Sequence, residues 1–216
     1  MRFMSDRSDE LLNVYDAAGA LVGTRPRREA KSSGLAVGAI NVLLVNSAGE
    51  VLLQLRVEDK ENGGLWDKSV GGHVSAGEDF DATALRETGE ELFGGNGASC
   101  VALVADEPAL HAAEQRLDLG AQVAFFRAGV QANLRDVRIA PGGGQRNVLY
   151  HVAIYLGRTD VPVARLSPQA SEISELRYFT PEQVDALLLD GRLAPNMAYL
   201  WLAYGQRALG LARGRA

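Results

Sequence analysis

The sequence predicts an α/β fold in which helices pack on a mixed β-sheet, and two observations support this prediction. Short strand-like runs lie on both sides of one strong helix candidate, and further helix candidates follow near the C-terminus. The chain has 216 residues, of which 47% are apolar and 23% charged, as in ordinary globular proteins. A chain of this length can bury one good hydrophobic core but is short for two. We therefore expect a single α/β sandwich.

The first half of the chain alternates strand-like runs with turn-forming residues. Two of the runs flank residues 47–50 (SAGE) and predict a β-hairpin, and a later extended piece is broken by two glycines. The expected extended segments are residues 11–15, 39–46, 51–56 and 66–74.

Residues 80–92 are the best helix candidate. Some of their apolar and small residues recur at helical spacing and are expected to face the core, whereas the glutamates are expected to face away from it. The expected buried residues are Ala84, Leu85, Thr88 and Leu92, and the expected exposed ones are Glu87, Glu90 and Glu91.

The second half of the chain returns to strands and then ends in helices. Thr180-Pro181-Glu182 predicts a helix start, because a hydroxyl N-cap is followed by proline at the first helical position. The expected strands are residues 100–104, 122–127, 148–156 and 175–179.

We interpret the organisation as a disordered tail over residues 1–10 followed by one domain over residues 11–216. Within that domain we expect an N-terminal extension at 11–38, an insertion at about 105–147 and a C-terminal helix at 195–214. An insertion of this kind would shape the choice of substrate.

The most informative segment runs from Gly72 to Gly94 and reads GHVSAGEDFDATALRETGEELFG. In a helix, Glu90 and Glu91 lie three and four positions after Glu87, which brings the Cβ atoms to about 5–6 Å from that of Glu87. Carboxylates this close repel one another unless a cation compensates their charge. Mg²⁺ suits such a group, because it prefers oxygen ligands and combines one or two carboxylates with waters and substrate phosphates. The spacing therefore indicates metal-assisted chemistry on a phosphorylated substrate.

The neighbouring residues fit the same chemistry. Gly71 and Gly72 allow a ligand to approach the backbone closely, and Glu78 precedes the helix N-terminus, where a carboxylate is favourable. Arg86 is placed to hold one of the carboxylates in a charge-assisted pair. The alternative interpretation is a solvated helix with an acidic face, which is what runs of charge usually form.

The segment resembles the Nudix box, the signature of hydrolases of nucleoside diphosphates linked to another group. Two positions depart from the family pattern: Thr88 stands at an apolar position, and Phe93 stands at the second glycine position, with Gly94 one residue later. The fixed positions of the box are occupied by Gly72, Glu78, Arg86, Glu87, Glu90 and Glu91.

This resemblance implies a Nudix-type α/β/α sandwich with a mixed β-sheet and a pyrophosphohydrolase that uses Mg²⁺, with Mn²⁺ as a substitute. It implies that Glu87, Glu90 and Glu91 bind the metal together with Gly72, and that Arg86 belongs to the catalytic group. The identity of the general base is left open, with Glu87 a candidate.

Family members often recruit a further acid from outside the box. In this chain the candidates are Glu172 and Glu175, in the segment SEISELRYF. The alternative for each of them is an acidic side chain at the surface, on a loop or a strand edge, with no role in the site.

Residues 11–94 also resemble the branch of the family that contains isopentenyl diphosphate isomerase. The isomerases place a catalytic cysteine just before the Gly-His pair, where this chain has Gly71, and its single cysteine, Cys100, lies beyond the helix. They also use an upstream histidine, and residues 34–38 contain none, although His73 matches. The residues therefore favour a hydrolase. The alternatives are an isomerase-like enzyme and a non-catalytic nucleotide-sensing module. A non-catalytic module would be expected to lose the acids of the box.

Composition limits the kinds of partner and the compartment that we expect for this protein. The net charge of −5 argues against a broad electrostatic contact with nucleic acid, so we expect a small phosphorylated substrate. The single cysteine fits a reducing compartment, and no signal-like or membrane-spanning apolar run is evident, so we expect a cytoplasmic protein. A homodimer is left open. The candidate substrate-binding residues are Arg56, Gly71, His73 and Glu78.

Overall fold

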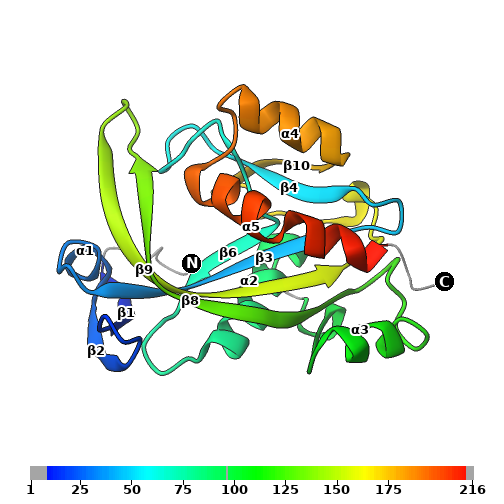
Figure 1. Cartoon of the computed structure of the whole chain (residues 1–216), viewed down its shortest axis with the longest axis horizontal. Helices are drawn as coiled ribbons and strands as arrows, with labels where there is room; N and C mark the ends of the chain where they lie inside the picture. Colours follow the sequence, from blue (N-terminus) through cyan, green and yellow to red (C-terminus); the bar gives the residue numbers. More distant parts are fainter. Residues whose placement is uncertain (1–8, 96, 213–216) are drawn as a thin grey trace, which may run out of the picture.

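The fold is taken from a computed structural model, which describes residues 9–95 and 97–212 (Figure 1). Most of the expected tail at 1–10 and the end of the helix expected at 195–214 therefore lie outside the described residues. Among the described helices, none combines the length and the apolar character needed to cross a membrane.

One curled mixed sheet forms the centre of the molecule. Its strands lie in the order β10-β4-β3-β9-β8-β7, with β1, β2, β5 and β6 paired at the side of this path. The β3–β9 and β7–β8 pairs are parallel and the other pairs are antiparallel, which confirms the expected mixed sheet. The bounds along this path are Ile173–Phe179 (β10), Val51–Arg56 (β4), Ala36–Val45 (β3), Gln145–Arg158 (β9), Val123–Ile139 (β8) and Val101–Val104 (β7).

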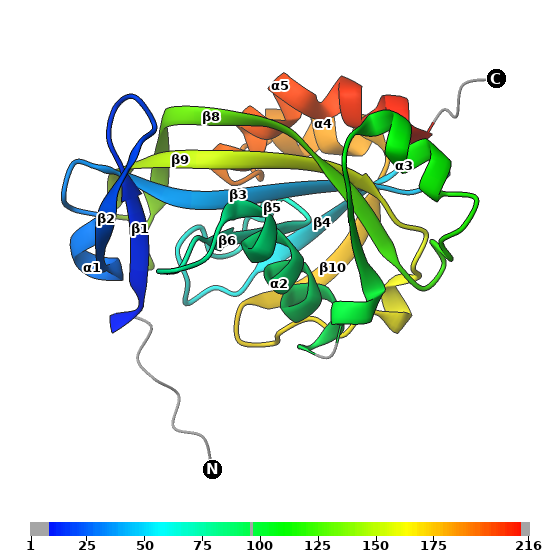
Figure 2. The same ribbon diagram turned by 90° about the horizontal axis from the view of Figure 1, so that it is seen from below.

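Helices cover both faces of the sheet, so the expected α/β/α sandwich is confirmed (Figure 2). Helix α2 (Phe80–Phe93) packs on one face, while α4 (Pro181–Leu189) and α5 (Pro195–Ala212) lie over the other. The buried β3 serves both layers, because successive side chains of a strand point to opposite faces. Its Leu43 joins the core under α5, and Val42 joins the core under α2.

The N-terminal segment contains elements that the sequence did not predict. The predicted β1 (Leu11–Tyr15) is present, and it pairs with an additional strand, β2 (Leu21–Pro26), and with β3. A single-turn helix, α1 (Arg27–Ala30), follows directly. The β2 sequence LVGTRP carries a glycine and a proline and is mostly exposed, so neither strand propensity nor alternation marks it as a strand. These elements bring Arg27 to the cavity described below.

Strands β8 and β9 are much longer than the predicted runs at 122–127 and 148–156. They form an antiparallel ribbon that rises beyond the sheet and closes in a turn at residues 140–144 (Figure 1, upper left). Much of the added length is only partly buried and is interrupted by two irregularities in register, so the apolar pattern ends before the strand does. The segment expected as an insertion at about 105–147 holds α3 (Glu107–Ala113), the whole of β8 and the first residues of β9.

The sequence explains both ends of α2. Asp79 accepts a hydrogen bond from the Ala82 backbone N–H at 2.8 Å and so caps the N-terminus. Gly94 adopts the left-handed conformation at the C-terminus, with φ of 66°. The helix therefore runs to Phe93, one residue further than predicted, which is consistent with a glycine that stands one position late.

One prediction about the faces of α2 is wrong. Glu91 is buried, with 8% of its surface exposed, although it was expected to lie on the exposed side. It faces β6 (Val70–His73) and β4, where the Gly71 backbone and the Gln54 side chain contact it. A carboxylate can occupy this position because polar groups of both strands point at it.

Candidate active site

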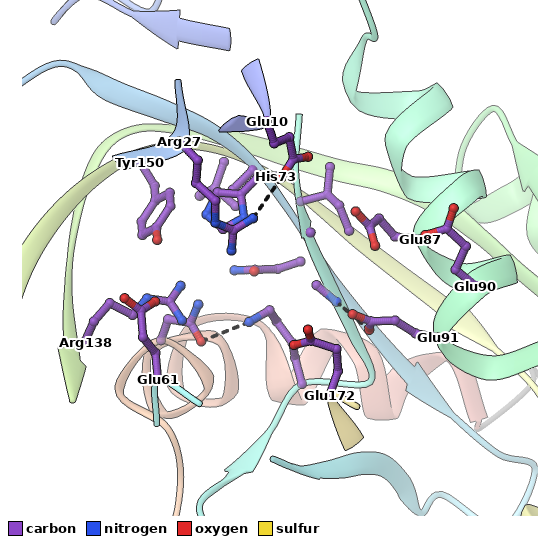
Figure 3. Close-up of a pocket in the computed structure, with 18 of the residues that line it drawn as sticks. Glu10, Arg27, Glu61, His73, Glu87, Glu90, Glu91, Arg138, Tyr150 and Glu172 are labelled. Atoms are coloured by element: carbon purple, nitrogen blue, oxygen red, sulfur yellow. Dashed lines mark hydrogen bonds and ion pairs between the residues drawn. The ribbon is translucent and has the colours of Figure 1, made fainter. Parts of the chain in front are cut away.

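A cavity of about 490 Å³ opens between α2, β3, β6 and the β8–β9 ribbon (Figure 3). The acidic residues of α2 form one wall, and Tyr150 and Arg138 from the ribbon lie across from them. Most of the residues singled out from the sequence line this cavity, namely Arg56, Gly71, Gly72, His73, Arg86, Glu87, Glu90, Glu91 and Glu172. Glu78 and Glu175 do not line it.

Glu91 is the most deeply placed of the acids. Its Oε2 accepts hydrogen bonds from the Gly71 backbone N–H at 3.2 Å and from Gln54 Nε2 at 3.3 Å. Burial, followed by the negative charge of Glu87, raises the pKa of the Glu91 carboxyl to about 8. Two carboxylates at the floor of one cavity thus repel each other, and a bound cation would relieve that repulsion.

Arg86 organises the acids around it. Its Nε and Nη2 donate to the two oxygens of Glu78 at 2.8 and 2.9 Å, a bidentate pair. Its Nη1 lies 3.0 Å from Glu87 Oε1 and 3.3 Å from Glu90 Oε2. The hydrogen bonds from Arg86 are the main reason why the pKa of Glu78 is lowered. Glu78 therefore acts as a positioning residue for Arg86, and its interpretation as a substrate contact finds no support in this geometry.

The two glycines of β6 leave room for side chains of the site. A Cβ atom on Gly72 would lie 2.4 Å from the Glu87 carboxyl carbon, and one on Gly71 would lie 2.2 Å from Lys68 Cε. Glycine at position 72 is thus needed for Glu87 to reach the cavity. The sequence interpretation had assigned this room to a ligand, whereas side chains of the protein itself use it.

The acids of α2 fit a divalent cation by their chemistry. Among the described residues, no three His, Cys, Asp or Glu side chains are grouped closely enough to hold an ion. Arg86 contacts Glu87 and Glu90 and compensates their charge in this arrangement. The donor set nevertheless consists of carboxylate oxygens around a backbone strand, which are the ligands that Mg²⁺ prefers.

The two candidate acids from outside the box lie in different surroundings. Glu172 lines the cavity, and its Oε1 is 3.5 Å from Lys60 Nζ. Glu175 is partly exposed and pairs with Arg177 on the same strand, at 2.8 Å. Only Glu172 is therefore brought to the acids of α2.

The sequence interpretation named Arg56 and Arg86 but missed three other basic residues of the cavity, Arg27, Lys68 and Arg138. Lys68 is buried, and its Nζ contacts Asp67 Oδ1 at 3.1 Å and Asn196 Oδ1 at 3.2 Å. Arg27 and Arg138 come from α1 and β8, far from the acidic segment in sequence. Lys68 carried a usable signal, because it stands only three residues before Gly71. The two arginines carried none, because only the fold brings their elements to the cavity.

His73, the last residue of β6, lines the cavity as a neutral imidazole. Burial, with Lys31 and Arg27 among the surrounding cations, lowers the pKa of His73 well below its usual range. Its Nε2 is buried and has no hydrogen-bond partner among the described residues. The ring centre lies 5.9 Å from that of Tyr150. His73 can therefore donate or accept one hydrogen bond toward a ligand without a change of charge.

Comparison with known proteins identifies the family of the chain. A model of the NUDIX domain matches residues 35–201. An uncharacterized Nudix hydrolase of Rhodococcus erythropolis is 31% identical over 187 residues, covering 85% of this chain and 84% of that protein. An uncharacterized Nudix hydrolase of Pseudomonas aeruginosa is 40% identical over 84 residues, 38% of this chain and 50% of that protein.

Isomerases are also among the similar proteins. An isopentenyl-diphosphate Delta-isomerase of Photorhabdus laumondii is 32% identical over 85 residues, 39% of this chain and 48% of the isomerase. The matched region thus spans about half the length of the Pseudomonas protein and of this isomerase.

Among solved structures, DR0079 from Deinococcus radiodurans shares the fold with a TM-score of 0.57 and 21% identity. The match covers 88% of this chain and 96% of that one.

Proposed function

Since the chain belongs to the NUDIX family, we propose that it is a Mg²⁺-dependent pyrophosphohydrolase in which water attacks phosphorus. The substrate would be a nucleoside di- or triphosphate or a related nucleoside diphosphate derivative. The observation that carries this proposal is the acidic wall of the cavity, where α2 presents Glu87, Glu90 and Glu91 together.

The residues that would hold the metal are Glu87, Glu90 and Glu91, together with the backbone of Gly72. When bound, the metal would polarise a phosphoryl oxygen and lower the pKa of a water molecule. Mn²⁺ could replace Mg²⁺, since it accepts the same oxygen ligands.

Other residues of the chain would hold these metal-binding carboxylates in position. Arg86 links Glu78, Glu87 and Glu90, and so limits the positions that the two helix carboxylates can adopt. Glu91 is held separately, by hydrogen bonds from the Gly71 backbone and the Gln54 side chain. Catalytic groups need such support, because small displacements of a reacting group reduce the rate strongly.

The proposed reaction forms one P–O bond, breaks another and moves one proton. The oxygen of water bonds to phosphorus, the bond from phosphorus to the bridging oxygen breaks, and a carboxylate accepts the proton of the water. Glu87 is the first candidate for this base, and Glu172 is the second because it also lines the cavity.

Isopentenyl diphosphate isomerisation is the rival function, since isomerases match part of the chain. A double-bond shift needs groups that move protons at carbon. The thiol that the resemblance would require is replaced by Gly71, and Cys100 lies in the 3-10 turn Ala98–Cys100, away from the residues that line the cavity. A non-catalytic nucleotide-sensing module is also less favoured, because every acid of the box is present.

A substrate panel tests this function. Purified protein with Mg²⁺ is expected to release phosphate, pyrophosphate or a nucleoside monophosphate from at least one nucleoside diphosphate derivative, and EDTA is expected to stop the release. Products would be separated by anion-exchange chromatography. If no nucleotide or prenyl diphosphate in a broad panel is cleaved, the hydrolase proposal fails. Conversion of isopentenyl to dimethylallyl diphosphate would support the isomerase instead.

A further inference from the structure

The wall of the cavity opposite α2 carries a second group of polar side chains, here called the distal cluster: Arg27, His73, Arg138 and Tyr150 (Figure 3). These residues come from α1, β6, β8 and β9. The proposed hydrolysis uses none of them.

Tyr150 is the most informative member of the distal cluster. Its side chain is almost fully buried, with 3% of its surface exposed, and it packs with Val37 and Val148. Its Oη is buried and has no hydrogen-bond partner among the described residues. Burial raises the pKa of this phenol, so it keeps its proton and remains a hydrogen-bond donor. A phenylalanine would fill the same space without an unsatisfied hydroxyl, which costs free energy when buried. The hydroxyl is therefore explained best by a ligand that accepts its hydrogen bond.

Charged side chains of both signs surround the Tyr150 phenol, namely Arg27 and Arg138 together with Asp136 and Glu61. The guanidinium carbon of Arg138 lies 5.1 Å from the centre of the Tyr150 ring. Arg138 pairs with Asp136 through Nε at 2.8 Å, and Arg27 pairs with Glu10 through Nη1 at 3.0 Å. A guanidinium has five N–H donors in a fixed fork, so one acid leaves donors of each arginine available to a ligand. The distal cluster thus offers donors of hydrogen bonds from several directions, two of them carried by guanidinium groups.

Within the distal cluster, His73 directly follows Gly72, whereas Tyr150 is set back along the sheet by more than the size of one phosphate. On β3, Tyr150 pairs with Val37, whereas Gly72 pairs with Ile40, three residues further along the strand. Three residues of a strand span about 10 Å. A pyrophosphate bound at the acids of α2 therefore does not also fill the space beside Tyr150.

We propose that the distal cluster binds a phosphate monoester that the substrate carries in addition to its pyrophosphate. This inference rests on the proposed hydrolysis for the position of the pyrophosphate. A tetrahedral dianion accepts hydrogen bonds in several directions, which matches donors from four elements of the fold, and arginine forks suit its oxygens. The substrate class is thereby narrowed to diphosphates with a second phosphate on the remote part of the molecule.

The first test measures the binding of inorganic phosphate to metal-free protein in EDTA by calorimetry. The wild type is expected to bind phosphate, and Tyr150→Phe is expected to weaken binding about tenfold, as for the loss of one charge-assisted hydrogen bond. The thermal midpoint of Tyr150→Phe should stay the same or rise, because no hydrogen bond within the protein is lost. Arg135→Gln is the matched control and should leave binding unchanged, since Arg135 is exposed on β8, where it pairs with Leu149, the neighbour of Tyr150 on β9.

The second test compares hydrolysis of matched pairs that differ by one phosphate monoester: coenzyme A with dephospho-coenzyme A, and ADP-ribose 2′-phosphate with ADP-ribose. In the wild type, kcat/KM should be at least about tenfold higher for the phosphorylated member of a cleaved pair. That ratio should fall in Tyr150→Phe and persist in Arg135→Gln.

The two tests separate the failure of this inference from the failure of the proposed function. If no pair is cleaved, the hydrolase proposal is in doubt, but the calorimetry still decides on the distal cluster. If the wild type does not bind phosphate, or if Tyr150→Phe binds it as tightly as the wild type, the inference is overturned. An equal kcat/KM for both members of a cleaved pair would overturn it too.

Discussion

Glu91→Gln is expected to lower Mg²⁺-dependent turnover by about 10²-fold or more while making the metal-free protein more stable at alkaline pH. Turnover should fall because an amide is a poor replacement for a carboxylate as a ligand of Mg²⁺. The fold should persist, because the amide oxygen can still accept the hydrogen bonds that Glu91 receives from Gly71 and Gln54.

The gain in stability follows from the pKa of Glu91. In the folded metal-free protein this pKa is raised from 4.5 to about 8 by burial and by the charge of Glu87. Between pH 4.5 and about pH 8, the folded state holds a proton on Glu91 that the unfolded state has lost. The free energy of unfolding therefore falls as the pH rises through this range. At about pH 8 the Glu91 carboxyl lowers the free energy of unfolding by up to about 4 kcal/mol. Glutamine does not titrate, so it does not have this effect.

Thermal unfolding in EDTA between about pH 5 and pH 9 measures this effect. The wild type should lose stability as the pH rises, and Glu91→Gln should lose less. Glu175→Gln is the control, because Glu175 is partly exposed and does not line the cavity, so this variant should behave as the wild type. Near-normal turnover in Glu91→Gln would refute the assignment of Glu91 as a metal ligand, and a loss of stability at about pH 8 would refute the electrostatic argument.

Gly72→Ala is expected to reduce turnover by about 10²-fold with only a small change in the free energy of unfolding. The added Cβ would lie 2.4 Å from the Glu87 carboxyl carbon, so the two groups cannot coexist. The Glu87 side chain can rotate away, whereas the paired β6 backbone cannot shift as readily. The substitution should therefore remove a carboxylate from the site, which costs catalysis more than stability.

The affinity for Mg²⁺ should fall together with the turnover of Gly72→Ala, and calorimetric titration would show both the loss and its size. Gly210→Ala is the matched control: a Cβ there meets no atom within 4 Å, and Gly210 lies in α5. It should keep full turnover and gain up to about 1 kcal/mol of stability, as alanine does in a helix. Equal turnover in both variants would show that Glu87 does not need the room at position 72.

Where local chemistry determines an element, the sequence predicted it well. The N-cap Asp79 and the left-handed Gly94 define α2 almost to the residue, and Thr180 with Gln183 forms the capping box that starts α4. The mixed sheet and its covering helices followed from the order of the elements. The lengths of β8 and β9 could not be predicted from the sequence. Residues 128–139 gain their strand structure from pairing with β9 and carry little apolar periodicity.

The candidate site divides in the same way. The acids of α2 are close in sequence and share one helix, so their spacing was enough to group them. The burial of Glu91 was missed because it depends on Gln54 and Gly71, from two other strands. Arg138 and Tyr150 of the distal cluster were missed because only the ribbon of β8 and β9 brings them to the cavity.

Hydrolysis in H₂¹⁸O tests the central claim most directly. With Mg²⁺ and a substrate found in the panel, mass spectrometry of the products should show one ¹⁸O atom in a phosphate group, because water attacks phosphorus. EDTA and Glu91→Gln should each remove the labelled product. Cleavage that places the label only on carbon, or cleavage that continues at the same rate in EDTA, would contradict the account.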